Sequence, residues 1–154
     1  PYDRIDVVIH PQSIVHSLVE FCDGSVIAQM GVPDMRLAIL YALTHPGRLP
    51  SRAVPRLDLQ TLGTLTFEKP DRDTFRCLDL AFEAARQGRT CPTVLNAANE
   101  VAVHRFLDGG IRYPDIPRLL TGVLERHDSS EPHDLDTILE ADAWGRRQAA
   151  QWTA

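Results

Sequence analysis

Two histidines near the start of the sequence are the side chains best suited to chemistry. His10 follows a β-branched run and opens the segment His10-Pro11-Gln12-Ser13, and His16 lies a few residues further on. Open sheets assemble active sites at strand ends, where an imidazole can donate a proton to a ligand or accept one. His10 is therefore a candidate site residue, although a strand-ending His-Pro pair also suits a purely structural turn.

A metal site is the weakest interpretation of the two histidines. Two imidazoles without a third ligand in reach specify no metal geometry. The three cysteines, Cys22, Cys77 and Cys91, are widely spaced and form no CxxC pattern, which argues against a zinc site and against a disulfide framework. Together with the lack of a signal-type leader or a membrane-length apolar run, these cysteines predict a cytoplasmic protein that binds no membrane.

Two further segments contain residue types that the predicted secondary structure alone does not explain. Met30 and Met35 flank a tight turn, Gly31 to Asp34, whose apolar side chains could close over a ligand, although methionines there are more often core. Asn96 to Glu100 lies inside a predicted helix, where asparagine is a poor helix former. Close helix packing on small alanines, with the amides bonded to neighbouring groups, explains this run better than ligand contact does.

Motifs for nucleotides, phosphates and hydrolytic chemistry are missing from the sequence. It contains no GxGxxG, Walker loop, HExxH or GxSxG, and its glycines stand at turns and helix ends. The net charge is -5, with Lys69 as the only lysine, so no basic surface for nucleic acid is indicated. We expect neither a cofactor-binding nor a metal-binding residue in this chain.

The first part of the chain has strand patterns followed by one helix. Asp6 to Ile9 predicts one buried strand that His10-Pro11 ends. A two-residue turn at Asp23-Gly24 would pair Phe21 with Val26. That register places one apolar set on a core face: Val19, Phe21, Val26, Ala28 and Met30. Asp34 is then expected to cap a helix from Met35 to about Thr44.

The second part of the chain is predicted to be helical after a proline-rich connector. A short strand is possible at Leu65 to Phe67, and the expected helices cover Phe75–Gln87, Pro92–Leu107, Asp115–Arg126 and Leu135–Trp152. The fold class is therefore α+β: a β-hairpin unit with a following helix, joined by a linker to a small C-terminal helical bundle. We expect units at residues 1–48 and 73–154, with residues 49–72 as the linker.

Several motifs, in order, resemble one enzyme family. They are Val8 to Ser13, Val15 to Ser17, Asp23 to Ser25, Gln29 to Arg36, Leu65 to Phe67, Cys77-Leu78 and Leu95 to Glu100. This series is similar to the reductoisomerases of the non-mevalonate isoprenoid pathway, and the resemblance covers nearly the whole chain. It implies the end of the family's central catalytic and dimerisation domain, followed by its C-terminal helical domain.

The resemblance implies an NADPH-dependent enzyme that converts 1-deoxy-D-xylulose 5-phosphate to 2-C-methyl-D-erythritol 4-phosphate with Mg or Mn. It also implies a homodimer whose dinucleotide-binding domain, metal ligands and phosphate-binding residues precede this chain. His10 then resembles a histidine on the substrate side of the site, in a supporting role. Pro33 and Met35 resemble a turn against which a lid closes, and Asn96 to Glu100 would be scaffold beneath the site.

Two expectations about activity follow. The chain alone should be inactive, because without metal ligands it cannot polarise the substrate carbonyl. The alternative interpretation is a helical interaction module that binds a partner strand at its hairpin edge, where unpaired backbone groups are available.

Overall fold

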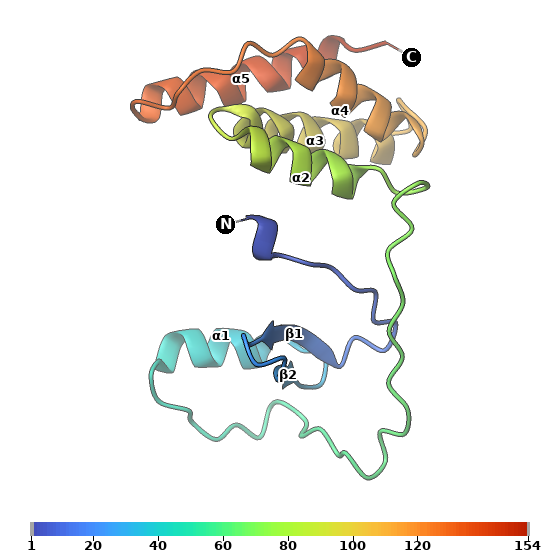
Figure 1. Ribbon diagram of the computed structural model, residues 1–154, viewed down its shortest axis with the longest axis vertical. Helices are drawn as coiled ribbons and strands as arrows, with labels where there is room; N and C mark the ends of the chain where they lie inside the picture. The colour runs from blue at the N-terminus through green and yellow to red at the C-terminus, as the bar shows by residue number, and fades with distance from the viewer. Residues whose placement is uncertain (1, 154) are drawn as a thin grey trace. The chain divides into compact units, whose positions relative to one another are not determined.

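The computed structural model describes residues 2–153 and divides them into two compact units (Figure 1). Val7–Pro70 forms one unit, and residues 71–153 form the other together with residues 2–6. The elements, in order, are the 3-10 helix η1 (Tyr2–Arg4), strands β1 (Val15–Glu20) and β2 (Val26–Met30), and helices α1 (Met35–Thr44), α2 (Cys77–Gln87), α3 (Cys91–Leu107), α4 (Asp115–Glu125) and α5 (Leu135–Gln151). The predicted α+β class is confirmed.

Local sequence signals place the helix boundaries well. Asp34 caps α1 by accepting the backbone N–H of Arg36 at 2.9 Å, and Asp134 caps α5 by accepting that of Thr137 at 2.8 Å. Such caps stabilise a helix by about 1 kcal/mol. Gly88 ends α2 with a φ of 67°, a conformation that glycine adopts without a Cβ penalty. All five predicted helices are therefore present, with ends that differ by two residues at most.

The hydrophobic core lies entirely among the helices. Leu119, Leu120 and Val94 are fully buried, and α3 packs closely against α4 and α5. Gly145 of α5 permits the closest approach, because a Cβ there would stand 3.1 Å from the carbonyl oxygen of Val94 and 3.3 Å from the Cβ of Ala97. Within residues 2–153 no helix is long and apolar enough to cross a membrane.

The register of the hairpin differs from the predicted one by one residue. Val19 pairs with Ile27 and Glu20 with Val26, because the loop holds three residues rather than two. The N–H of Gly24 donates to the carbonyl of Phe21 at 2.9 Å, and Gly24 then takes a φ of 82°. This is the three-residue hairpin loop with a left-handed closing glycine. The predicted apolar face is therefore wrong, since a shift by one residue exchanges the faces of one strand.

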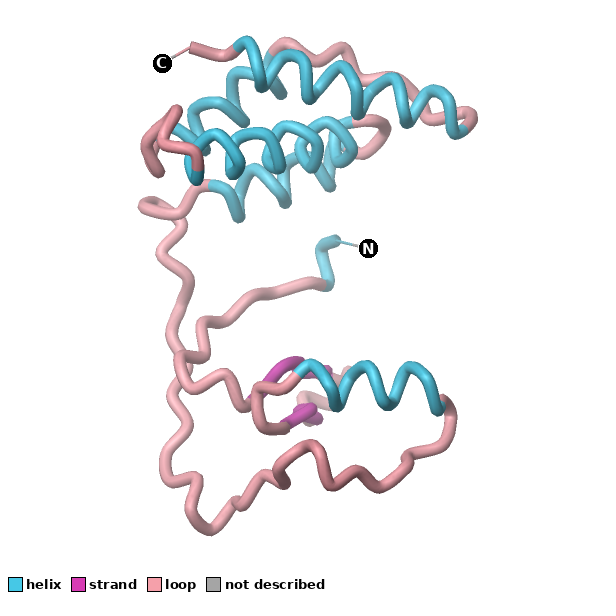
Figure 2. Tube along the Cα trace, turned by 180° about the vertical axis from the view of Figure 1, so that it is seen from behind, coloured by secondary structure: helices cyan, strands magenta, loops and turns pink. Residues whose placement is uncertain are grey.

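The predicted buried strand at residues 6–9 is also wrong. Ile9 forms a single antiparallel bridge with Glu68, and both Val8 and Ile9 are nearly half exposed. No strand covers Leu65 to Phe67 in the described chain, and the connection from α1 to α2 is loop (Figure 2). A β-branched run alone does not make a strand when only one bridge pairs with it.

The two units differ sharply in how much they bury. Across residues 7–70, Gly31 alone is buried, and exposed apolar side chains cover both faces of the hairpin. The boundary at Pro70 and Asp71 falls inside the segment expected as a linker, whereas residues 2–6 group with the helices, so they lie outside the unit expected at 1–48. An isolated hairpin is marginally stable in water, so most of the folding free energy resides in the helices.

Hydrogen exchange of the purified chain should separate the two units. Amides of α3 and α4 should exchange more slowly than those of β1 and β2 by roughly a hundredfold or more, because local opening is easiest where few apolar contacts exist. Mass spectrometry of peptides from each unit measures this. Equal protection in hairpin and helices would contradict it.

Candidate functional site

One cavity lies beside the hairpin and α1. It has a volume of about 630 Å³ and lies within the unit Val7–Pro70. The residues that line it are Ser13, His16, Gln29, Val32, Pro33, Asp34, Met35, Leu37, Ala38, Tyr41 and Arg48. Its size suits a small ligand, and its lining combines apolar side chains with a few polar groups.

The turn between β2 and α1 positions the cavity wall. Gly31 is buried at this turn, and a Cβ there would stand 3.4 Å from Leu37 and 3.7 Å from the Nε2 of His16. These are ordinary van der Waals distances, so the turn lies against Leu37 and His16 without a clash. Pro33 and Met35 follow on the same turn, and Met35 is 72% exposed. Both residues predicted to contact the substrate or lid thus line the cavity.

The acidic group in the cavity is already paired. Nε of Arg36 lies 3.0 Å from both carboxylate oxygens of Asp34. The hydrogen bonds from the Arg36 guanidinium, and then from its backbone N–H, hold the pKa of the Asp34 carboxyl below its usual value. Asp34 is thus ionised at neutral pH, and its charge is balanced by Arg36.

His10 lies apart from this lining. Its Nδ1 donates to the carbonyl of Thr66 at 2.8 Å, and its ring stacks on Phe67 with centroids 4.7 Å apart. The Nε2 atom of His10 is buried with no hydrogen-bond partner among the described residues. His10 therefore ties the start of the unit to the Thr66 segment, which Gln12 also bonds through its side chain at 2.7 Å.

Sequence reasoning missed most of the polar cavity lining. His16 was considered only as a metal ligand, and Ser13 only as part of the His10 cluster. Ser13 takes a φ of 52°, which is uncommon for a residue other than glycine and directs the chain into β1. Arg48 follows Pro46-Gly47 in the connector and gave no signal in the sequence, because only the tertiary fold brings it beside α1.

The Asn96 to Glu100 run makes contacts within the helical unit. The side-chain amide of Asn96 donates to Glu100 at 3.2 Å, and Arg146 of α5 donates to Glu100 at 2.8 Å. Hydrogen bonds from Arg146, the larger cause, and from Asn96 lower the pKa of Glu100. These contacts join α3 to α5.

No metal centre is evident in the part of the chain that the structure describes. Within residues 2–153 no group of three His, Cys, Asp or Glu side chains converges to hold an ion. His10 and His16 therefore have no third ligand with which to form the metal site considered from the sequence.

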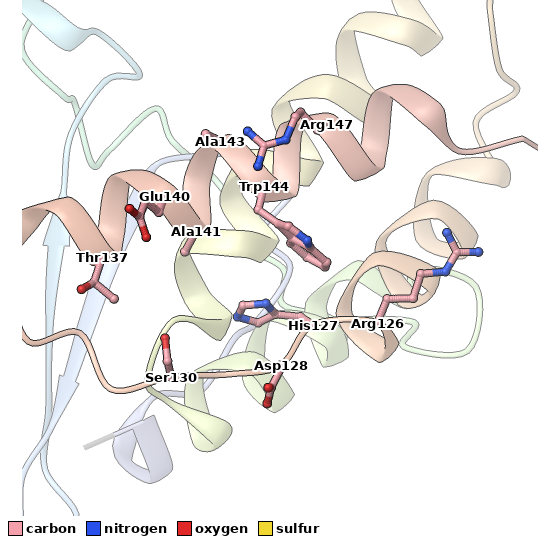
Figure 3. A pocket seen from close by; sticks show the side chains of 10 residues that line it. All are labelled: Arg126, His127, Asp128, Ser130, Thr137, Glu140, Ala141, Ala143, Trp144 and Arg147. Carbon is pink, nitrogen blue, oxygen red and sulfur yellow. The ribbon is translucent and has the colours of Figure 1, made fainter.

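A second cavity, of about 480 Å³, lies in the helical unit (Figure 3). Figure 3 shows the side chains of Trp144 and His127 pointing toward one another, with ring centroids 5.0 Å apart. Nε2 of His127 lies 2.8 Å from the hydroxyl of the buried Thr90, which also accepts the N–H of Ser130 at 3.2 Å. Desolvation by burial lowers the pKa of His127, and the nearby Asp128 only partly offsets this.

Comparison with known proteins assigns most of the chain to one family model. The model described as the DXP reductoisomerase C-terminal domain matches residues 30–148. The 1-deoxy-D-xylulose 5-phosphate reductoisomerases of Pelotomaculum thermopropionicum and of Synechococcus sp. are each 57% identical over 150 residues. The alignment covers 97% of this chain and 38% of each relative, so the chain spans well under half of their length.

Solved structures agree with these relatives. The Zymomonas mobilis reductoisomerase in complex with NADPH matches 93% of this chain and 38% of its own, with 40% identity and a TM-score of 0.86. A DOX-P reductoisomerase in complex with NADPH, fosmidomycin and magnesium matches the same share of this chain and 37% of its own, with 44% identity and a TM-score of 0.87.

The helical unit should lose stability as the pH falls. The ordinary histidine pKa is 6.5, and His127 has a lower value when folded, so the unfolded state binds the proton more readily. The contribution of His127 to the free energy of unfolding is therefore complete above pH 6.5. It is lost as the pH falls through the pKa that His127 has in the folded state. The melting temperature of α2–α5, followed by circular dichroism, should decrease between about pH 7 and about pH 5.

Matched histidine variants identify the source of this change. His127→Gln should weaken the pH dependence, whereas His133→Gln, at an exposed histidine of the following loop, should retain it. Identical pH profiles for His127→Gln and the unaltered chain would contradict the assignment.

Proposed function

This chain belongs to the 1-deoxy-D-xylulose 5-phosphate reductoisomerase family, and on that premise we propose that it forms the C-terminal part of such an enzyme. The whole protein would convert 1-deoxy-D-xylulose 5-phosphate to 2-C-methyl-D-erythritol 4-phosphate in non-mevalonate isoprenoid biosynthesis, using NADPH and Mg or Mn. Residues 1–48 would belong to its central catalytic and dimerisation domain, and residues 73–154 to its C-terminal helical domain.

The cavity beside α1 is the observation that carries this proposal. Pro33 and Met35 stand at its open edge, and His16 lies in its lining. Such an arrangement forms one wall of a small-molecule site. The opposite wall would come from the remainder of the polypeptide. We assign substrate and lid contact to Pro33 and Met35, with His16 as an additional polar group on the same wall.

His10 has a supporting role in this proposal. Its bond to Thr66 and its stack on Phe67 hold together the chain segments on either side of the hairpin and α1. That position suits orientation of the site rather than proton transfer at the substrate, because a general acid or base must reach the proton that it moves.

The metal and the nicotinamide cofactor do not fit the residues of this chain. Three converging ligands are lacking across residues 2–153, and the sequence has no glycine-rich phosphate-binding turn. We therefore assign both groups to residues outside this chain, where NADPH would supply hydride and the metal would polarise the substrate. The chain's own contribution is the wall that orients the substrate and excludes water.

The remainder of the same polypeptide is the first partner that we propose. Val19 and Ile27 are cross-strand neighbours and are both more than half exposed, so the hairpin needs a cover. Within the described residues its sheet has two strands, and each has an unpaired edge that further strands of the enzyme can occupy. A homodimer would cover more of this surface. The three free cysteines suit the reducing cytoplasm that we propose as its compartment.

Activity should depend on the longer polypeptide. The native protein, expressed from its whole gene, should oxidise NADPH only when substrate and a divalent metal are both present, and the 154-residue chain alone should not. A spectrophotometric assay that follows the absorbance of the reduced nicotinamide measures this. An inactive longer protein would contradict the function, and an active isolated chain would contradict the division of labour.

Met35 should contribute binding energy when the site closes. In the native protein Met35→Ala should lower kcat/KM roughly tenfold, because covering an exposed methionine stabilises by a few kcal/mol at most. Ile39→Ala is the matched control, since Ile39 lies on the same helix, is 52% exposed and does not line the cavity. Equal effects of the two substitutions would rule out a specific role for Met35.

A further inference from the structure

The cavity of the helical unit contains charges of both signs that are not paired within the protein. Its volume is about 480 Å³, and its charged lining residues are Arg126, Asp128, Glu140 and Arg147. Within residues 2–153 none of these four side chains forms an ion pair. The size suits a small ligand, and the charges stay available to it.

The two adjacent arginines of α5 have different surroundings. Arg146 donates to Asp142 at 2.7 Å and to Glu100 of α3 at 2.8 Å. Arg147 makes no such contact and lines the cavity instead. The contact between α3 and α5 therefore engages Arg146 and leaves the charge of Arg147 on the cavity side of the helix.

One face of α5 arranges charge and aromatic ring in order. Glu140, Trp144 and Arg147 follow one another by four and three residues, so they lie on the same face of the helix and together line the cavity (Figure 3). A rise of about 1.5 Å per residue separates the Cα atoms of Glu140 and Arg147 by roughly 10 Å. The cavity thus has an anionic and a cationic group on either side of Trp144.

The facing wall comes from the end of α4 and the loop that follows it. Arg126 and Asp128 add one charge of each sign, and the ring of His127 lies between them in sequence and 5.0 Å from the ring of Trp144. Desolvation by burial lowers the pKa of His127, so this ring is largely neutral at neutral pH. The rings of His127 and Trp144 therefore provide flat, weakly polar surface between the charged groups.

We propose that this cavity binds a small zwitterionic ligand whose carboxylate and ammonium groups are separated by a planar apolar body. Arg147 binds the carboxylate, Glu140 binds the ammonium group, and the Trp144 ring packs against the planar body. A ligand of one sign would pair with some of the lining side chains and repel the others, whereas a zwitterion complements both. The inference goes beyond the proposed function, because this cavity belongs to the helical unit and not to the unit Val7–Pro70.

Three related compounds test the proposal on the native full-length protein. The zwitterion para-(aminomethyl)benzoate carries both charges on one aromatic ring, benzylamine carries the cation alone, and para-methylbenzoate carries the anion alone. The zwitterion should bind about tenfold more tightly than either of the others, the effect expected of one charge-assisted hydrogen bond. Ligand-observed NMR titration, which detects weak binding, measures the three dissociation constants. No binding of the zwitterion, or equal binding of all three compounds, would overturn the proposal.

Two charge variants locate the site. Arg147→Gln should weaken binding of the zwitterion about tenfold and leave benzylamine unaffected, whereas Glu140→Gln should weaken the zwitterion and leave para-methylbenzoate unaffected. Trp144 packs against the core, so its removal would also disturb folding, whereas Glu140 and Arg147 are exposed and test binding alone. Unchanged affinity for the zwitterion in both charge variants contradicts the assignment, because binding would then occur elsewhere.

Arg76→Gln and Glu83→Gln are the matched controls, since both residues are exposed in the same unit and do not line the cavity. Equal weakening by these controls would overturn the proposal, because the net charge of the protein would then explain the effect. Failure of the proposed function has a different signature, since the unaltered native protein would then show no substrate-dependent oxidation of NADPH.

Discussion

Among the described residues, the buried apolar side chains lie in the helical unit, and that imbalance constrains the rest of the molecule. Helices α2 to α5 enclose a core with fully buried leucines, whereas residues 7–70 bury only Gly31. The hydrophobic effect that drives folding is roughly proportional to the apolar surface area removed from water. The helical unit therefore contains most of the apolar contacts that stabilise the fold, whereas the hairpin unit leaves most of its apolar side chains exposed.

Close packing between α3 and α5 stabilises the helical unit. Gly145 and Ala97 allow the two backbones to approach, and Arg146 then reaches Glu100 across the contact. That ion pair is largely exposed, so its energy is small and its value lies in geometry. The polar run Asn96 to Glu100 thus contributes to the contact between α3 and α5. It belongs to the helical unit, whereas the residues that line the cavity beside α1 belong to the unit Val7–Pro70.

The cavity shows how a weakly buried unit still positions functional groups. Asp34 caps the start of α1, the turn at Gly31 lies against His16, and the Tyr41 ring stacks on Arg48. These contacts form within residues 7–70, where no apolar side chain is buried. The resulting wall is preformed on one side, which suits a site that a longer polypeptide completes.

The sequence by itself determined the helices, their caps and the family. These depend on short-range chemistry: a carboxylate that accepts an N–H two or three residues ahead, a glycine with positive φ, and a proline that cannot continue a helix. Tertiary structure decided the hairpin register, because a third loop residue exchanges the strand faces. It also separated His10 from the cavity lining and brought Arg48 into it, since contacts between distant segments leave no periodic pattern along the chain.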